Sequence, residues 1–255
     1  MTTSYAWNRS KRFVNIKNVE RIEDTINYTL QTGYPTLITS APGMGKTTAL
    51  REYAERTNAV YCEINQTTKG LKGMFEMLIE EHGYYSDKQY TSEIGKICHH
   101  HLSDYYNRRY CLSPLIIDEY QTLEPKNQRE LLSLQERCGI PLVLSGNNER
   151  LAGKKEDRGA LQQIESRIAM HTQLDRLSAQ DCERLAVAFN VEGVDAYRAL
   201  SSFGCKTSVR ELVRLLEECE RIVNGAGGIR LHHVESALMG LSGASKKLEL
   251  LSAEA

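Results

Sequence analysis

Apolar residues follow two periods up to residue 175, and their alternation predicts a unit of mixed helices and strands. Apolar positions three or four residues apart predict helices, and short uninterrupted apolar runs predict strands. The expected helices cover residues 18–32, 47–56, 71–81, 91–109, 127–137 and 160–168. The expected strands cover residues 35–39, 59–64, 115–117, 142–144 and 171–174. Because strands and helices alternate along the chain, we expect an α/β fold with a parallel sheet.

After Asp175 the pattern becomes helical throughout, which predicts a second and smaller domain. Helices are expected at residues 179–189, 194–203, 208–223 and 231–240. Ser178 and Asp181 resemble a capping box at the start of the first of these, with Asp where Glu is usual. The chain therefore divides into an N-terminal arm (1–17), an α/β core (18–175), a helical domain (176–241) and a C-terminal tail (242–255).

Composition and charge narrow the class of protein. The 255 residues are 41% hydrophobic and 25% charged, which is typical of a soluble globular protein. The formal net charge of −1 means that any surface for nucleic acid has to be local. No apolar run approaches the roughly 20 residues of a membrane span, and the first residues do not form a signal peptide. Seven cysteines without a CxxC motif suit a reducing compartment, so we expect a cytoplasmic protein.

A glycine-containing loop between an expected strand and an expected helix has the context of a phosphate-binding loop. Glycines let the backbone amides approach a phosphate closely, and the start of the helix adds a favourable dipole. Lys46 is placed to reach the β- and γ-phosphates, and the hydroxyl of Thr47 to bind Mg²⁺. Ser40 stands where the first glycine is usual, a position that mainly requires a small residue. The residues predicted to hold the nucleotide are Ser40, Ala41, Pro42, Gly43, Met44, Gly45, Lys46, Thr47 and Thr48.

Two carboxylates follow the apolar strand at residues 115–117. Asp118 is placed to hold Mg²⁺ directly or through water, and Glu119 is placed to polarise an attacking water as a general base. An apolar run followed by Asp-Glu is by itself more often a helix cap. Together with a phosphate-binding loop 71 residues earlier, it predicts hydrolysis of a nucleotide.

The strand at 142–144 leads to a polar amide, Asn147. If this strand lies beside the strand that precedes the loop, Asn147 can form a hydrogen bond with the γ-phosphate or the attacking water. The alternative is a turn formed by the pair Asn147 and Asn148.

These motifs, in this order and followed by a helical domain, resemble those of AAA+ ATPases. The resemblance implies a five-stranded P-loop core with an all-helical C-terminal lid, and ATP and Mg²⁺ bound where subunits of a ring or filament meet. A segment around residues 164–168 is similar to the one that carries the arginine finger, which implies that role for Arg167. Residues 207–212 are similar to the lid helix of the second sensor, which implies that role for Arg210. The alternative for each arginine is a solvated helix residue. Asn65 resembles the polar switch residue with which some AAA+ proteins hold the catalytic glutamate.

Within the AAA+ proteins, the motifs are most similar to transposition ATPases of the MuB and TnsC kind. This implies ATP-dependent, non-sequence-specific binding of duplex DNA, assembly of further copies into a ring or filament, and recruitment of a transposase or another transposition protein to the target. One alternative is a helicase-loader or initiator-like ATPase that acts mainly on a protein partner. Another is a nucleotide-gated scaffold with negligible turnover.

Lys69 and Lys72 are the first candidates for contact with DNA. They are three residues apart at the start of the helix expected at 71–81, so we expect them on one helix face. A few phosphate contacts per subunit, repeated along a filament, can supply affinity without a basic monomer. The alternative is a pair of solvated lysines, and the N-terminal arm with Arg9, Lys11 and Arg12 is then the next candidate.

Overall fold

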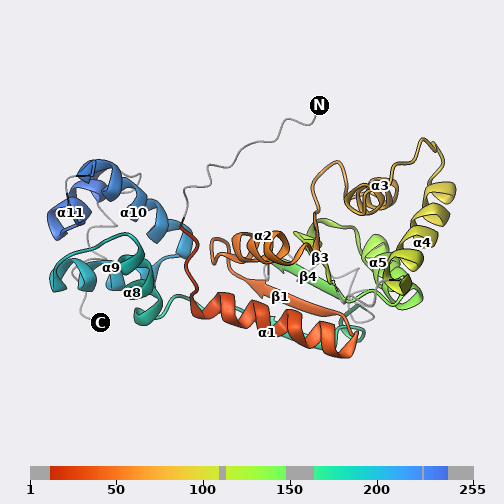
Figure 1. Ribbon diagram of the computed structural model, residues 1–255, viewed down its shortest axis with the longest axis horizontal. Coiled ribbons are helices and arrows are strands. Elements are labelled where there is room, and N and C mark those ends of the chain that lie inside the picture. Colours follow the sequence, from red (N-terminus) through yellow and green to blue (C-terminus); the bar gives the residue numbers. More distant parts are fainter. Residues whose placement is uncertain (1–11, 109–112, 148–163, 226, 241–255) are drawn as a thin grey trace. The chain divides into compact units, whose positions relative to one another are not determined.

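The computed structural model describes residues 12–108, 113–147, 164–225 and 227–240 (Figure 1). It divides into two compact units. One is formed by Asn18–Asp175 and contains the sheet; the other is formed by Arg176–Ala255 together with Met1–Lys17, and its described residues are mainly helical.

A parallel sheet forms the centre of the first unit. Its five strands are β1 (Thr36–Ser40), β2 (Val60–Glu63), β3 (Leu115–Asp118), β4 (Leu142–Asn147) and β5 (Met170–Gln173). Their order across the sheet is β2-β3-β4-β1-β5, and every pairing is parallel. The prediction of a parallel five-stranded sheet is therefore confirmed. This order places the carboxyl ends of β3, β4 and β1 next to one another at one edge.

Helices cover both faces of the sheet (Figure 1). They are α1 (Lys17–Thr32), α2 (Lys46–Thr57), α3 (Leu71–Glu81), α4 (Thr91–Arg108) and α5 (Pro125–Cys138), with a 3-10 turn, η1, at Tyr120–Thr122. Cys62, Ile117 and Leu144 point to the face of α3, α4 and α5 and share one apolar core with them. The opposite face contacts α1, where the hydroxyls of Thr29 and Thr36 form a hydrogen bond of 2.7 Å.

The segment before β5 departs from the helix expected at residues 160–168. Residues 160–163 lie outside the described part of the chain, and only Ile164 and Glu165 are helical before a turn at Ser166 and Arg167. The turn is closed by the backbone hydrogen bond from Arg167 N to Ile164 O, 3.1 Å long. Ala169 N then bonds to the carbonyl of Pro35 at 2.9 Å, which brings β5 alongside β1.

The second unit is helical, as the sequence predicts for the C-terminal part. It contains α8 (Ala179–Ala188), α9 (Val194–Lys206), α10 (Val209–Val223) and α11 (Leu231–Gly240). Apolar side chains from α9, α10 and α11 are fully buried, among them Leu200, Phe203, Leu212, Leu216 and Leu238. A short parallel bridge between Val191 and Ile229 joins the loops before α9 and α11.

The described end of the N-terminal arm packs on this helical unit. The guanidinium of Arg12 donates to the carbonyl of Ala188 at 2.6 Å and lies 3.1 Å from Glu220. Arg184 donates to the carbonyl of Asn15 at 3.1 Å. Residues 1–11, which include Arg9 and Lys11, lie outside the described residues, so a role of the arm in contact with DNA stays a prediction.

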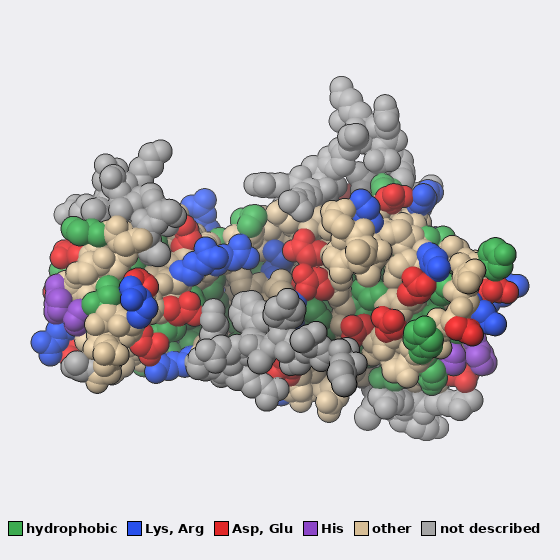
Figure 2. Space-filling view, turned by 90° about the horizontal axis from the view of Figure 1, so that it is seen from above, with side chains coloured by type: hydrophobic (Ala, Val, Ile, Leu, Met, Phe, Trp, Pro, Cys, Tyr) green, Lys and Arg blue, Asp and Glu red, His purple; other side chains and the backbone are tan. Residues whose placement is uncertain are grey.

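Charges of both signs are interspersed over the sheet unit on the face drawn in Figure 2. This agrees with the nearly balanced 32 basic and 33 acidic residues of the whole chain. Within the residues that the structure describes, no helix combines the length and the apolar character needed to cross a bilayer.

A capping box begins α8, as the sequence predicts. The Ser178 hydroxyl accepts from Asp181 N at 3.2 Å, and the Asp181 carboxylate accepts from Ser178 N at 3.1 Å. The same carboxylate accepts from Lys17 N at 2.8 Å and from the Ser178 hydroxyl at 2.7 Å. Burial alone would raise the pKa of Asp181, but these hydrogen bonds outweigh it and lower the pKa below its usual value.

We expect Asp181→Asn to lower the free energy of unfolding of the helical unit by about 1–2 kcal/mol at neutral pH. Since the pKa of Asp181 is lowered on folding, its stabilisation is complete above the unfolded value of about 3.9 and is lost as pH falls through the folded value. The difference from wild type, measured by urea unfolding at several pH values, should therefore shrink under acid conditions. Glu183→Gln, which changes an exposed carboxylate of the same helix, should have little effect at any pH; equal effects of the two substitutions would contradict the prediction.

Candidate functional site

The loop between β1 and α2 has the form that the sequence predicts. β1 ends at Ser40 and α2 begins at Lys46. Gly43 and Gly45 adopt φ values of 81° and 88°, in the left-handed region that favours glycine. The backbone amides before α2 therefore lie at a helix N-terminus, which is a general site for anions such as phosphate.

Lys46 is held inside this loop. Its side chain is only 9% exposed, and its ammonium donates to the hydroxyl of Ser40 at 2.6 Å and to the Ser40 carbonyl at 3.4 Å. Ser40, which replaces the usual glycine, thus supplies an oxygen that orients the lysine. The replacement fits the loop.

The carboxylate of Asp118 lies beside the start of α2 and is almost completely buried, at 1% exposure. Oδ2 accepts a hydrogen bond from the Thr47 hydroxyl at 2.7 Å, and Oδ1 accepts one from the Glu119 amide at 2.9 Å. A hydroxyl and a carboxylate oxygen side by side form the kind of oxygen donor set that Mg²⁺ prefers. Thr47 and Asp118 therefore fit the predicted metal site.

Glu119 has a backbone conformation that is rare for its residue type. Its φ and ψ are 54° and 33°, in the left-handed helical region. The other non-glycine residues of positive φ in the described part of the chain are Asn58, Asn190 and Asn224, and asparagine tolerates this region far better. Strain of this sort is often concentrated at functional sites. It turns the chain sharply between β3 and η1.

Asn147 lies at the end of β4, which pairs with β1, so the condition on which its predicted role depends is met. In the register of the sheet, Asn147 is opposite Ser40. The backbone N–H of Asn147 donates to the side-chain oxygen of Gln121 at 3.1 Å, and the side-chain nitrogen of Gln121 donates to the Glu119 carboxylate at 2.5 Å. Gln121 therefore bridges Glu119 and Asn147, a link that the sequence motifs do not indicate.

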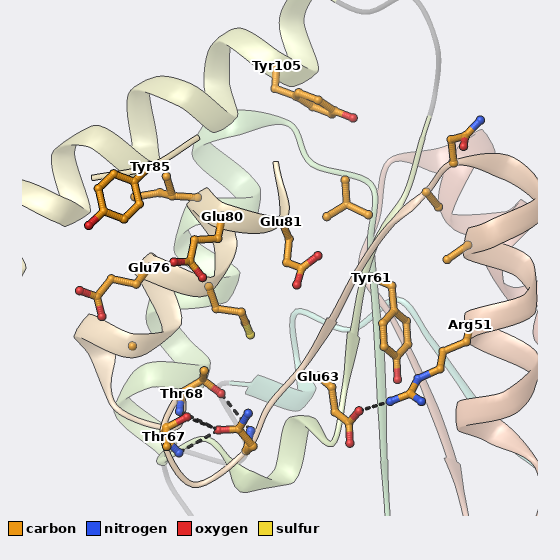
Figure 3. Close-up of a pocket in the computed structure, with 18 of the residues that line it drawn as sticks. Arg51, Tyr61, Glu63, Thr67, Thr68, Glu76, Glu80, Glu81, Tyr85 and Tyr105 are labelled. Atoms are coloured by element: carbon orange, nitrogen blue, oxygen red, sulfur yellow. Dashed lines mark hydrogen bonds and ion pairs between the residues drawn. The ribbon is translucent and has the colours of Figure 1, made fainter. Parts of the chain in front are cut away.

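Tyr61 is the second site residue that the sequence analysis missed. Its hydroxyl donates to Oδ2 of Asp118 at 2.9 Å. Figure 3 shows Arg51 of α2 next to Tyr61 and ion-paired with Glu63. Burial, and then the negative charge of Asp118, raise the pKa of the Tyr61 phenol far above its usual value. The phenol therefore stays protonated and acts as a donor to the carboxylate.

The predicted arginine finger lies away from this loop within one chain. Arg167 precedes β5 and is ion-paired at 3.5 Å with Glu136, close to the end of α5. The segment that follows it meets Pro35, just before β1, so Arg167 is near the amino edge of the sheet. The loop and Asp118 are at the carboxyl edge. Arg210 belongs to α10 of the helical unit, where it is exposed, and its role stays a prediction.

The expectation that Lys69 and Lys72 share a helix face is wrong. Gly70 is extended, with φ and ψ of −79° and 158°, and caps α3, so the helix begins at Leu71 and excludes Lys69. The Lys69 ammonium donates to the side chain of Gln66 at 2.8 Å. Lys72, in the first turn, lies 3.6 Å from Glu76.

Asn65, the predicted polar switch, takes part in the turn after β2. Its side-chain oxygen accepts hydrogen bonds from the Thr67 amide at 2.8 Å, the Thr67 hydroxyl at 2.6 Å and the Thr68 amide at 3.1 Å. In this conformation the amide oxygen therefore stabilises the turn.

The sequence of this chain is similar to a domain family and to two curated proteins. Residues 29–153 match the AAA domain family. The chain is similar to the ATP-dependent target DNA activator B of Escherichia phage Mu, with 26% identity over 187 residues, 71% of this chain and 57% of the relative. It is also similar to the protein of the same name from Escherichia phage D108, with 25% identity over 200 residues, 76% of this chain and 62% of the relative. The matches thus span about three fifths of these two relatives.

Solved structures share the fold at low sequence identity. The Aeropyrum pernix ORC2 protein, in its ADPNP–ADP complexes, superposes with a TM-score of 0.63 and 18% identity, over 93% of this chain and 70% of that one. A mutant of Thermotoga maritima RuvB superposes with a TM-score of 0.56 and 18% identity, over 90% of this chain and 70% of that one. These likenesses show that the fold is shared.

We expect Lys46→Ala to weaken the binding of ATP by about 10–100-fold, because a charge-assisted hydrogen bond contributes about 1.5–3 kcal/mol. Titration with a fluorescent ATP analogue would measure the loss. Lys96→Ala, a change of an exposed lysine on α4, is the matched control and should bind as wild type. Unchanged affinity in the Lys46 variant would mean that the loop does not bind phosphate through this side chain.

Proposed function

We propose, from the AAA domain that this chain carries, that the protein is an ATP-dependent, non-sequence-specific DNA-binding ATPase that assembles on DNA and regulates the choice of a transposition target. The observation that carries the proposal is the convergence of Lys46, Thr47, Asp118 and Glu119 at the carboxyl edge of the sheet. Similarity to two phage proteins named as ATP-dependent target DNA activators supports the link to transposition. Recruitment of a transposase would follow from the same similarity.

Each residue of the site has a part in hydrolysis that its position supports. The loop amides and Lys46 would bind the phosphates of ATP, and Thr47 and Asp118 would hold Mg²⁺. The metal, when bound, neutralises negative charge on the phosphoryl oxygens. Glu119 would polarise the attacking water and accept its proton as a general base. Gln121 would orient the Glu119 carboxylate and connect it to the strand end at Asn147.

An ATP site completed by a neighbouring copy is part of the proposal. Arg167 lies at the opposite edge of the sheet from Lys46, so its predicted role at the γ-phosphate requires a second copy of the chain. Its partner Glu136 is exposed, and exposed ion pairs contribute only about 0–1 kcal/mol. Arg167 could therefore leave Glu136 and bind a phosphate of the neighbour's nucleotide at little cost in free energy. This supports assembly into rings or filaments.

DNA would be bound by a few lysines in each copy. Lys69 and Lys72 flank the start of α3; Lys69 is exposed and Lys72 is partly exposed, with neutral or acidic partners in Gln66 and Glu76. Their separation by Gly70 places one on the loop and one on the helix, so they can reach adjacent phosphates without sharing a helix face. Phosphate contacts position a protein on DNA but carry no sequence information.

We expect Glu119→Gln to bind ATP as wild type and to hydrolyse it about 10²–10⁴-fold more slowly, because the amide preserves the shape of the side chain but cannot accept the proton. Steady-state phosphate release, with and without duplex DNA, measures the effect. Glu124→Gln, at the exposed N-cap of α5, is the control and should keep wild-type turnover. Wild-type turnover in Glu119→Gln would reject the general base. Negligible turnover in wild type itself would favour the nucleotide-gated scaffold.

We expect the double substitution Lys69→Ala and Lys72→Ala to weaken duplex DNA binding equally for all sequences. The slope of log affinity against log salt concentration should flatten by about 0.9 for each DNA phosphate that the variant no longer neutralises. Binding is measured at several salt concentrations with a saturating non-hydrolysable ATP analogue, and Lys88→Ala with Lys96→Ala is the control pair.

Affinity and slope equal to those of wild type would remove these two lysines from the DNA surface. Failure of wild type to bind any duplex DNA would instead favour the helicase-loader or initiator-like alternative, in which the main partner is a protein.

A further inference from the structure

We infer that Tyr61 is a positioning residue for the Asp118 carboxylate and that it sets the affinity of the site for Mg²⁺. The inference rests on the proposed function, since it concerns the same ATP site. Tyr61 belongs to no recognisable sequence motif, and it reaches the site only because of the pairing of two strands.

Strand register brings the phenol to the carboxylate. β2 pairs in parallel with β3, and Tyr61 lies opposite Ile116. Asp118 is two residues further along β3, so its side chain emerges on the same face of the sheet as Ile116. The long tyrosine side chain spans this offset, and its hydroxyl donates to Oδ2 of Asp118 at 2.9 Å.

The same hydrogen bond closes a ring of side chains that begins and ends on α2. Thr47 donates to Asp118, and Tyr61 donates to the same carboxylate. The guanidinium of Arg51 lies over the aromatic group of Tyr61, 5.4 Å from its centroid. Arg51 is four residues after Thr47, so both lie on one face of α2. The ring therefore couples the first turn of α2, the edge strand β2 and the end of β3.

The links of this ring differ in strength. Arg51 and Glu63 form an ion pair in which each side chain is 43% exposed, at the rim of a groove lined by Glu76, Glu80 and Glu81 (Figure 3). An exposed pair of this kind contributes about 0–1 kcal/mol. The bond from Tyr61 ends on a carboxylate that is almost completely buried, where hydrogen bonds to a charged group are stronger. Loss of the phenol hydroxyl should therefore matter more than loss of the ion pair.

The chemistry of the two donors to Oδ2 explains the role of the tyrosine. The Thr47 hydroxyl is itself a candidate ligand of Mg²⁺, and it can donate its proton to Asp118 while a lone pair of the same oxygen binds the metal. The phenol hydroxyl of Tyr61 is a second donor to the same carboxylate oxygen. Partners that orient a ligating carboxylate in this way typically change metal affinity by about 10–100-fold when they are removed.

The test is a magnesium titration of Tyr61→Phe, which removes the hydroxyl and keeps the ring. Binding of a non-hydrolysable ATP analogue is followed as a function of Mg²⁺ concentration, and the midpoint should rise by about 10–100-fold. Binding of nucleotide without the metal should equal that of wild type. Tyr53→Phe, which removes the hydroxyl of a buried tyrosine on the same helix as Arg51, is the matched control and should keep the wild-type midpoint. Arg51→Gln should shift the midpoint in the same direction by a smaller factor.

A wild-type midpoint in Tyr61→Phe, or in a second folded variant such as Tyr61→Leu, would overturn the inference. Equal losses with and without Mg²⁺ would also overturn it, because they would indicate general damage to the fold. If wild-type protein shows no effect of Mg²⁺ on nucleotide binding, the proposed ATP site fails, and that result is distinct from either outcome for Tyr61.

Discussion

The hydrogen-bond donors that one buried carboxylate requires organise the candidate site. Asp118 is almost inaccessible to solvent, and a buried ionised carboxylate is costly unless donors surround it. Three donors do so: the Thr47 hydroxyl, the Tyr61 hydroxyl and the Glu119 amide. They come from the start of α2, from β2 and from the end of β3. The need to satisfy this charge therefore fixes how a helix, an edge strand and a central strand meet.

The order of the strands supplies the rest of the site. Because β4 lies between β1 and β3, the ends of three strands meet at one edge, with Asn147 opposite Ser40. Ser40 orients Lys46 from one side, and Gln121 connects Glu119 to β4 from the other. The same directionality sends the segment of Arg167 to the opposite edge. The phosphate-binding loop and Arg167 thus lie at opposite edges of a single parallel sheet. An ATP site between copies would bring the loop of one copy to the Arg167 of another.

Most of the fold could be predicted from local sequence, since the bounds of α3 at residues 71–81 follow from its apolar period alone. The strand, loop and helix around Lys46 were predictable for the same reason. The roles of Tyr61 and Gln121 were not, because they depend on strand register and on one side chain bridging two elements. The position of Lys69 was also missed, because the extended Gly70 makes α3 begin at Leu71, two residues after Lys69. Contacts of the arm, such as Arg12 with Ala188, depend on tertiary packing that periodicity does not encode.

The left-handed backbone of Glu119 has a consequence for the variation that this position tolerates. Such a conformation costs glutamate about 1–2 kcal/mol, and glycine or asparagine would relieve much of it. Selection for thermal stability alone would therefore favour replacing the carboxylate that the proposed reaction requires. Screens of mutant libraries by melting temperature would enrich inactive sequences at this site. Retention of glutamate at this position would indicate selection for ATP turnover at the expense of thermal stability, in keeping with the general trade-off between stability and activity.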